Sequence, residues 1–268
     1  MIHTDPVLAT SVTACAARLL SLIGPRRPKV HCITNTVAQP LTANVLLSAG
    51  AVPSLTTAQE EIAAFARSAD VLLLNLGTLD AERRRAIEVA LDQGGGLPWL
   101  LDPVFVDRSS TRRDFAATLV KRKPSVLRLN AGEFTALAGR APSADAVRAY
   151  AKATGAVVAL TGATDFVSDG LRSLAVRNGH ALMSMVTAMG CAGSAFIAAA
   201  LVVEDDPLIA TAAALIAFGV AGEVAAARSK GPGSFAVEII DAIHGLTFET
   251  IVERTRVTVE AVEGSCAP

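Results

Sequence analysis

One short stretch combines a thiol with a candidate anion site. The nonapeptide VTAMGCAGS at 186–194 leads directly into the apolar segment 195–203. A glycine-containing loop that opens a long helix leaves backbone N–H groups without partners, and the helix dipole adds positive charge there. This field should lower the pKa of the Cys191 thiol. A phosphoryl group in transfer beside a nucleophilic hydroxyl fits this stretch, and so does a small buried cysteine in a closely packed helix start.

Two acidic residues are candidates for binding a metal ion. Asp102 follows the apolar run 99–101, and Glu133 lies three residues after Asn130, which ends the apolar run 126–129. Carboxylates that bind Mg²⁺ through water beside a nucleotide phosphate are a common arrangement in kinases. Each acid also has a purely structural interpretation. Asn130 and Glu133 have the spacing of a capping box, and Asp102 before Pro103 can be a turn residue.

Several standard motifs are absent from the sequence. It contains no GxxxxGK[ST], no GxGxxG after a strand and no GxSxG. The sequence therefore does not indicate a P-loop NTPase, a dinucleotide-binding Rossmann enzyme or an α/β-hydrolase. Its four cysteines lack CxxC spacing, so neither a zinc site nor a disulfide framework is expected. His31 and His180 are expected to be structural, because neither stands beside an acid.

The composition indicates one globular domain. The 268 residues are enough for one large α/β domain over 1–268, and no composition break suggests a second. With 51% hydrophobic but only 4% aromatic residues, the core must consist mainly of Ala, Val, Leu and Ile. A net charge of −1 leaves no electrostatic footprint for nucleic acid or an anionic membrane. The N-terminal residues lack a signal-peptide pattern, so a cytoplasmic location is expected.

A membrane protein is the alternative that the mean hydropathy of +0.46 raises. The two most apolar runs are 192–203 and 208–221, and the acidic triplet 204–206 separates them. Each is shorter than the roughly 20 residues that a membrane-spanning helix needs. Both are therefore expected to be helices buried inside a soluble fold or an oligomer.

Strand and helix signals alternate along the chain. Strands are expected at 29–33, 52–55, 71–76, 99–101, 126–129 and 157–160, followed by a hairpin of 166–168 and 171–177. Helices are expected from Asp5-Pro6 to about Leu22, at 41–49, from about 60, from the cap Asp80 to 93, between 104 and 125, after Asn130, and at 143–155. Three helices, 190–203, 207–228 and 234–245, are expected to close the chain.

This alternation predicts a mainly parallel sheet with helices on both faces. In such folds the ligand lies outside the carboxyl ends of the strands. The polar residues and glycines expected at those ends are Thr34, Asn35, Asn75, Gly77, Thr78, Asp102, Asn130, Glu133, Thr161 and Gly162. We expect the functional site at this edge of the sheet.

An ordered series of short motifs makes the chain similar to a known family. The motifs are VHCITN (30–35), LTAN (41–44), GA (50–51) with Pro53, EE (60–61), NLGTL (75–79), LDPV (101–104), NAGE (130–133), NGH (178–180) and KGPGSF (230–235). Together they resemble the hydroxyethylthiazole kinases of thiamine salvage, which are members of the ribokinase-like superfamily. The resemblance covers nearly the whole chain and implies a three-layer α/β/α fold.

The resemblance also implies an activity: ATP- and Mg²⁺-dependent phosphorylation of the hydroxyl of 4-methyl-5-(2-hydroxyethyl)thiazole, in a homotrimer with sites between subunits. The family's site residues match Cys191 and Gly190 as catalytic residues, Arg112, Thr161 and Asn130 as nucleotide contacts, Leu55, Ala188 and Asn35 as substrate contacts, and Asp102 and Glu133 as metal-site acids. A cysteine can stand where sugar kinases carry an aspartate base, because phosphoryl transfer depends mainly on positioning and charge stabilisation.

The chain departs from the family pattern near the expected site. It has TAMGC at 187–191 where TGTGC or TGAGC is usual, so Ala188 adds a Cβ and Met189 adds bulk. Ala163 replaces the acid of TGE-x-D, Leu55 replaces Met, and Phe105 and Asp107 replace glycine or a small residue. Two alternatives therefore stay open: a related pyrimidine or sugar kinase, and a thiazole- or nucleotide-binding homologue with weakened catalysis.

Overall fold

A single curved sheet organises the chain. The computed structural model describes residues 6–260, and their nine strands are hydrogen-bonded in the order β2-β1-β3-β4-β5-β6-β7-β8-β9. Strands β1 to β6 pair in parallel, and β7 to β9 complete the sheet with antiparallel pairings. The strands are β1 (Lys29–Ile33), β2 (Val52–Ser54), β3 (Val71–Asn75), β4 (Trp99–Asp102), β5 (Val126–Leu129), β6 (Val157–Leu160), β7 (Asp165–Ser168), β8 (Ser173–Val176) and β9 (Val257–Val259).

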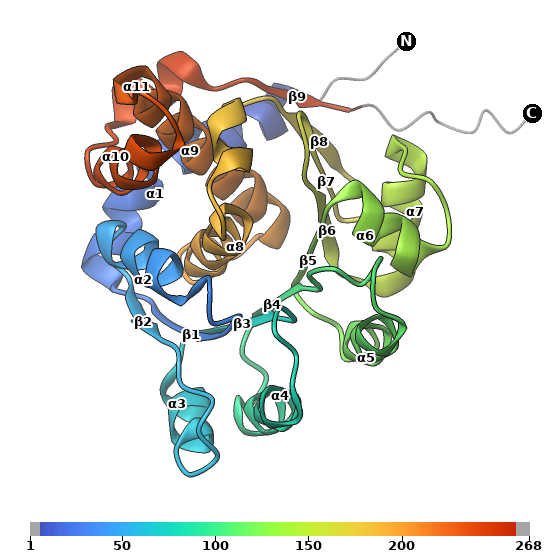
Figure 1. The fold of residues 1–268 in the computed structure, drawn as a ribbon. Helices are drawn as coiled ribbons and strands as arrows, with labels where there is room; N and C mark the ends of the chain where they lie inside the picture. The colour runs from blue at the N-terminus through green and yellow to red at the C-terminus, as the bar shows by residue number, and fades with distance from the viewer. Residues whose placement is uncertain (1–5, 261–268) are drawn as a thin grey trace, which may run out of the picture.

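Helices form a layer on each face of the sheet. Figure 1 shows α1, α2 and α8 to α11 inside the curve of the sheet and α3 to α7 along its outer side. The helices are α1 (Pro6–Arg26), α2 (Gln39–Ser48), α3 (Ile62–Ser68), α4 (Ala81–Gln93), α5 (Ser110–Val120), α6 (Ala131–Ala138), α7 (Ala144–Thr154), the 3₁₀ helix η1 (Ala181–Met185), α8 (Met189–Ala200), α9 (Pro207–Arg228), α10 (Pro232–His244) and α11 (Phe248–Arg254). The predicted mainly parallel sheet between two helix layers is confirmed.

The central strands are buried on both faces. All five residues of β3 are buried, with Val71 and Leu73 in the core on the α8 side and Leu72 and Leu74 in the core on the α4 side. This explains the unbroken apolar run, which is typical of a parallel strand covered by two layers. The register pairs Asn75 with Asp102, so β3 and β4 end side by side.

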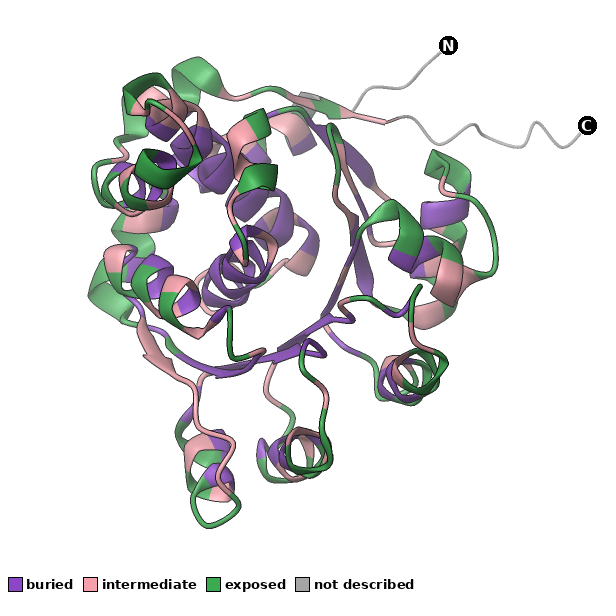
Figure 2. Cartoon of the chain, in the orientation of Figure 1, coloured by how far each residue is buried: buried purple, intermediate pink, exposed green. Residues whose placement is uncertain are grey.

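Helix α9 is longer than the apolar run 208–221, which was predicted to be too short to span a membrane. Val7–Arg26 in α1 and Pro207–Arg228 in α9, with mean hydropathies of 1.7 and 2.0, are long and apolar enough to span a membrane by length and composition alone. Of the most apolar 18-residue stretch of each, 83% is buried in α9 and 39% in α1. Figure 2 shows α8 and α9 coloured almost entirely as buried. Burial against α1, α8 and α10 therefore explains the apolar character of α9.

Most predicted boundaries agree with the structure, and two do not. The predicted strands and the hairpin begin and end within two residues of β1 to β8, and Asp80 caps α4 by accepting a hydrogen bond from Arg83 N–H at 2.7 Å. Helix α1 continues past Leu22 through Pro25, which falls in its last turn; the predicted cap Asp5 lies outside the described residues. The chain does not end with three helices, because α11 and β9 follow α10.

Candidate functional site

Three polar side chains predicted at the sheet edge meet Cys191 at the start of α8. Asn75 Nδ2 donates a hydrogen bond to Asp102 Oδ2 at 3.0 Å and lies 3.2 Å from Cys191 Sγ. Asn35 Nδ2, which follows β1, lies 3.4 Å from the same sulfur. The carboxyl ends of β1, β3 and β4 thus converge on Cys191, as expected for a ligand site in an open parallel sheet.

Asp102 is buried with only one of its carboxylate oxygens in use. Its side chain is 1% exposed, and Oδ2 accepts hydrogen bonds from Asn75 and from Ser194 Oγ at 2.7 Å. Arg128 Nη1 lies 3.7 Å from Oδ2. The other oxygen, Oδ1, is buried and has no hydrogen-bond partner among the described residues. A buried acceptor without a partner is rare in folded proteins, so Oδ1 is available to a ligand.

Cys191 is a protonated thiol at neutral pH. Burial, followed by the negative charge of Asp102, raises the pKa of Cys191 to about 11. The amide groups of Asn75 and Asn35 and the charge of Arg128 act in the opposite direction but do not compensate. The predicted lowering of this pKa by the helix start is therefore wrong, because desolvation disfavours the thiolate more strongly than nearby donors favour it.

Glu133 has both of its carboxylate oxygens occupied. Oε1 accepts from Phe105 N–H at 3.0 Å and Oε2 from Asn130 N–H at 2.9 Å, while Asn130 Oδ1 accepts from Glu133 N–H at 2.9 Å. The predicted capping box is confirmed, and it occupies the Asn130 side chain. Burial and the charge of Asp102 raise the pKa of Glu133, so the two acids are close enough to interact.

These acids fit a magnesium ion that arrives with a nucleotide. No group of three or more His, Cys, Asp or Glu side chains in residues 6–260 is arranged to hold a metal ion. The carboxylate oxygen of Asp102 that lacks a partner, with Glu133 nearby, provides what Mg²⁺ commonly takes from a protein, because phosphates and water complete its coordination.

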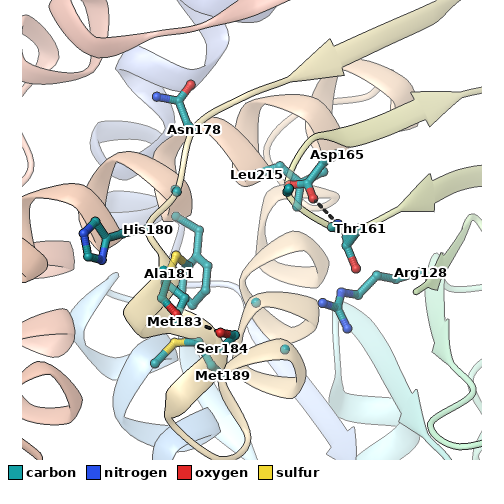
Figure 3. A pocket seen from close by; sticks show the side chains of 17 residues that line it. Arg128, Thr161, Asp165, Asn178, His180, Ala181, Met183, Ser184, Met189 and Leu215 are labelled. Atoms are coloured by element: carbon teal, nitrogen blue, oxygen red, sulfur yellow. Dashed lines mark hydrogen bonds between the residues drawn. The ribbon is translucent and has the colours of Figure 1, made fainter. Parts of the chain in front are cut away.

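A cavity of about 670 Å³ adjoins this cluster (Figure 3). Its walls come from β5, the loop after β6 and the start of β7, the loop before η1, η1 itself, the first turns of α8 and the middle of α9. The lining residues are Arg128, Thr161, Gly162, Ala163, Asp165, Asn178, Gly179, His180, Ala181, Met183, Ser184, Met189, Gly190, Gly193, Leu215, Phe218 and Gly219. Of the residues predicted to bind nucleotide or act in catalysis, Thr161 and Gly190 line this cavity.

Arg112 and Leu55 do not line it. The Arg112 Nη1 group donates to Val104 O at 2.7 Å in the loop after β4, and burial lowers the pKa of Arg112 while the charge of Glu133 raises it. Leu55 follows β2 and packs, partly buried, against the core on the α8 side. The structure therefore places Arg112 near the acids and Leu55 at the edge of the helical core.

The loop before α8 takes a conformation that glycine favours. Ala188, the N-cap of α8, has φ +66° and ψ 2°, in the left-handed region. The neighbouring Met189 is buried in the core, which accommodates its bulk. Phe105 also has a positive φ, of 60°, and its side chain is half exposed. Two positions where the family usually carries glycine or a small residue thus have glycine-like backbone angles with larger side chains.

Two site residues were not among the sequence-based candidates. Ser194 lies one turn after Cys191 on α8, and this spacing could have indicated that both face the same strands. Arg128 interrupts the otherwise apolar strand β5, and a charged residue in a buried strand is a signal of its own.

Comparisons with known proteins agree on one family. A sequence model of the "Hydroxyethylthiazole kinase family" matches residues 20–249. A hydroxyethylthiazole kinase of Granulibacter bethesdensis is 42% identical over 257 residues, which cover 90% of this chain and 94% of that protein. A probable hydroxyethylthiazole kinase of Agrobacterium fabrum is 42% identical over 246 residues, with coverages of 91% and 95%.

Solved structures confirm the expected ribokinase-like fold. The hydroxyethylthiazole kinase protein from Pyrococcus horikoshii superimposes with a TM-score of 0.86 at 37% identity, covering 91% of this chain and 98% of that chain. A ribokinase-like superfamily protein of Enterococcus faecalis superimposes with a TM-score of 0.63 at 13% identity, covering 84% of this chain and 88% of that chain. At that low identity the second similarity concerns the fold alone.

Proposed function

The chain belongs to the hydroxyethylthiazole kinase family, and on that premise we propose that it phosphorylates the hydroxyl of 4-methyl-5-(2-hydroxyethyl)thiazole with ATP, for thiamine biosynthesis or salvage. The observation that carries this proposal is the cluster of Asn35, Asn75, Asp102 and Cys191 at the start of α8, beside a large cavity. Such a site can hold an alcohol at the cluster and a nucleotide in the cavity.

The reaction requires positioning more than a strong base. The hydroxyl oxygen forms a bond to the γ-phosphorus while the bond to the bridging oxygen breaks, ADP leaves, and the hydroxyl proton passes to a phosphate oxygen or to solvent. Because the transition state is loose, little nucleophilic activation is needed. In our proposal the protonated Cys191 orients the hydroxyl, which agrees with its raised pKa of about 11. Backbone N–H groups around Gly190 hold the transferring group.

Asp102 and Glu133 are proposed to hold Mg²⁺, which neutralises charge on the phosphates when bound. Thr161, Arg112 and Asn130 are proposed as nucleotide contacts. Thr161 lines the cavity and Arg112 lies near Glu133, which supports their assignment.

Asn35, Leu55 and Ala188 are proposed to contact the thiazole. The position of Asn35 beside the Cys191 sulfur supports a role at the acceptor end of the site. The position of Leu55 directly after β2, whose neighbour β1 leads to Asn35, agrees with the same end.

We further propose that the chain works as one domain over 1–268, in a cytoplasmic homotrimer that binds neither nucleic acid nor membrane. One continuous sheet supports the single domain. Four of the six large apolar side chains that are more than half exposed in residues 6–260 support an interface between subunits: Val37, Leu47, Met185 and Val237. They lie on or beside α2, η1 and α10, and α10 contacts both α2 and η1.

The acceptor specificity decides between this function and its alternatives. Purified protein is incubated with ATP and Mg²⁺ and with hydroxyethylthiazole, hydroxymethylpyrimidine or ribose, and kcat/KM is measured for each. We expect the thiazole to be preferred, and Asp102→Asn to remove turnover with all three. A preference for the pyrimidine or the sugar identifies a related kinase. Binding of thiazole and ATP without turnover identifies a binding protein with weakened catalysis.

A further inference from the structure

The guanidinium of Arg128 has no hydrogen-bond partner among the described residues. Arg128 is the single charged residue of β5, and its side chain is 19% exposed. Its ion-pair neighbour is Asp102, with Nη1 3.7 Å from Oδ2, and its charge also acts on Glu133 and Asp165, yet the guanidinium donates no hydrogen bond within residues 6–260. A guanidinium offers five N–H donors, so this arrangement leaves substantial capacity for an anion.

The ion pair with Asp102 does not account for Arg128. The oxygen nearest to Arg128 already accepts hydrogen bonds from Asn75 and Ser194, at 3.0 and 2.7 Å. At 3.7 Å the guanidinium makes no hydrogen bond to it. A mostly buried charge is costly unless it is paired and hydrogen-bonded. Arg128 therefore lies where a second anion would satisfy it.

The first turn of α8 is shaped to receive this guanidinium. A Cβ at Gly190 would lie 2.9 Å from Arg128 Nη1 and 3.1 Å from Nη2, so only glycine permits the present approach. Figure 3 shows Arg128 extending from its strand into the cavity, below Thr161. The guanidinium and the open N–H groups of the helix start thus act on the same region of the cavity.

We propose that Arg128 binds the transferring phosphoryl group of the nucleotide and stabilises it during transfer. This inference rests on the proposed kinase function. Arg128 is placed at the γ-phosphate because its guanidinium lies beside Asp102, at the Cys191 end of the cavity, and not at the end formed by Asn178 and Met183. As the bond to the substrate oxygen forms and the bond to ADP breaks, the guanidinium donates to phosphoryl oxygens, which suits its planar pair of N–H groups.

Replacing Arg128 should weaken only the interactions that the protein makes with the terminal phosphate. Arg128→Gln should lower kcat about 10²- to 10³-fold, the usual effect of losing one donor to a transition state. Affinity for a non-hydrolysable ATP analogue should fall about 10-fold or more, whereas affinity for ADP should stay within about 2-fold. Arg128→Lys should recover part of kcat, because it restores the charge but not the paired N–H geometry.

A matched control removes a guanidinium from elsewhere. Arg26 ends α1, next to β1's first residue, at the opposite edge of the sheet, and pairs with Asp70 on the surface. Arg26→Gln should leave kcat and both affinities unchanged. If Arg128→Gln does not fold, Arg128→Lys serves instead, because it keeps the charge and removes the paired N–H groups. It should give a smaller loss of kcat with unchanged ADP affinity.

The outcomes separate this inference from the proposed function. Equal kcat for Arg128→Gln and Arg26→Gln, or equal losses of affinity for ADP and for the ATP analogue, would overturn the assignment of Arg128 to the γ-phosphate. If the wild-type protein does not phosphorylate the thiazole, the proposed function fails. The comparison of ADP with the ATP analogue then still decides whether Arg128 binds the terminal phosphate.

Discussion

The environment of Cys191 decides its chemical role. A cysteine at a helix start is expected to be a reactive thiolate from sequence, because the helix field lowers its pKa. In the structure, burial and the carboxylate of Asp102 raise the pKa to about 11 instead. The sequence does not reveal this, because Asp102 lies 89 positions earlier and approaches Cys191 only through folding. A protonated thiol that accepts amide hydrogen bonds suits positioning of a hydroxyl.

The backbone at Ala188 stores strain that glycine would relieve. With φ at +66°, an alanine at this N-cap costs about 1 kcal/mol relative to glycine. Ala188→Gly should therefore raise the free energy of unfolding by about 1 kcal/mol, measured by urea denaturation. The control Ala195→Gly, in the interior of the same helix, should lower it by about 1 kcal/mol. Destabilisation by both variants would show that residue 188 is not strained.

Asp165 makes stability depend on pH. Burial raises its pKa from 3.8 to about 6, although Gly162 N–H and Arg128 act to lower it. Between these values the unfolded chain ionises while the folded carboxyl stays protonated, so its contribution to stability is present below pH ~4 and is lost as pH rises through ~6. Asp165→Asn should match wild type below pH ~4 and exceed its unfolding free energy by about 2 kcal/mol at pH 7.

Thermal unfolding of both proteins from pH 4 to 8 measures this difference. The side-chain amide in Asp165→Asn can still accept the hydrogen bond that Gly162 N–H donates at 2.9 Å, so the variant changes the charge and little else. A difference that stays constant over this pH range would contradict the raised pKa of Asp165.

Among the helices and strands, the features that depend on neighbouring residues in the sequence could be predicted from it. The continuous apolar run of β3, the caps Asp80 and Ser143, and the capping box of Asn130 and Glu133 could all be recognised in the sequence. The rule that ligands bind at the carboxyl ends of parallel strands also predicted that Asn35, Asn75 and Asp102 lie together. That rule did not identify Arg128, because Arg128 lies within β5 and not after its end.

The elements that were missed depend on contacts between distant segments. Strand β9 has three residues and exists through its pairing with β8. Its neighbour Arg256 pairs with Glu223 of α9, and Glu223 also accepts hydrogen bonds from Asn178 Nδ2 and Gly179 N–H, each at 3.0 Å. The C-terminal strand is thus tied through α9 to a turn that lines the cavity, and no local pattern encodes such a link.

Glu223 should therefore affect both stability and the cavity. Glu223→Ala leaves the amide groups of Asn178 and Gly179 without their acceptor, so the free energy of unfolding should fall by about 2 kcal/mol. The KM for ATP should rise while kcat changes little, because the turn lines the cavity away from Asp102. Glu223→Gln keeps an acceptor oxygen and serves as the control. An unchanged KM in Glu223→Ala would contradict this link.

For the whole molecule, the Ala-rich composition reflects two tightly packed helices. Helices α8 and α9 are buried on nearly every side, and alanine allows their close approach to the sheet and to each other. Four of the exposed apolar residues, Val37, Leu47, Met185 and Val237, lie on or beside α2, η1 and α10, and the others within residues 6–260 lie on α1, on α11 and in loops. Exposed apolar patches on folded proteins commonly mark interfaces.

Val237 on α10 tests the proposed trimer. Val237→Arg places a charge within the apolar patch and should shift the protein toward monomers in analytical ultracentrifugation. Leu171→Arg is the matched control, because Leu171 is similarly exposed in the turn between β7 and β8, outside the patch. A monomeric wild-type protein, or the same oligomer in both variants, would contradict a trimer built on this patch.

The most direct test of the proposed function is mass spectrometry of a reaction that contains wild-type protein, ATP, Mg²⁺ and hydroxyethylthiazole. We expect a thiazole product that is heavier by one phosphoryl group, with one ADP formed for each product molecule. ADP formed without phosphorylated thiazole, or both ligands bound with neither product, would contradict the claim that the cluster of Asn35, Asn75, Asp102 and Cys191 is a kinase site for this alcohol.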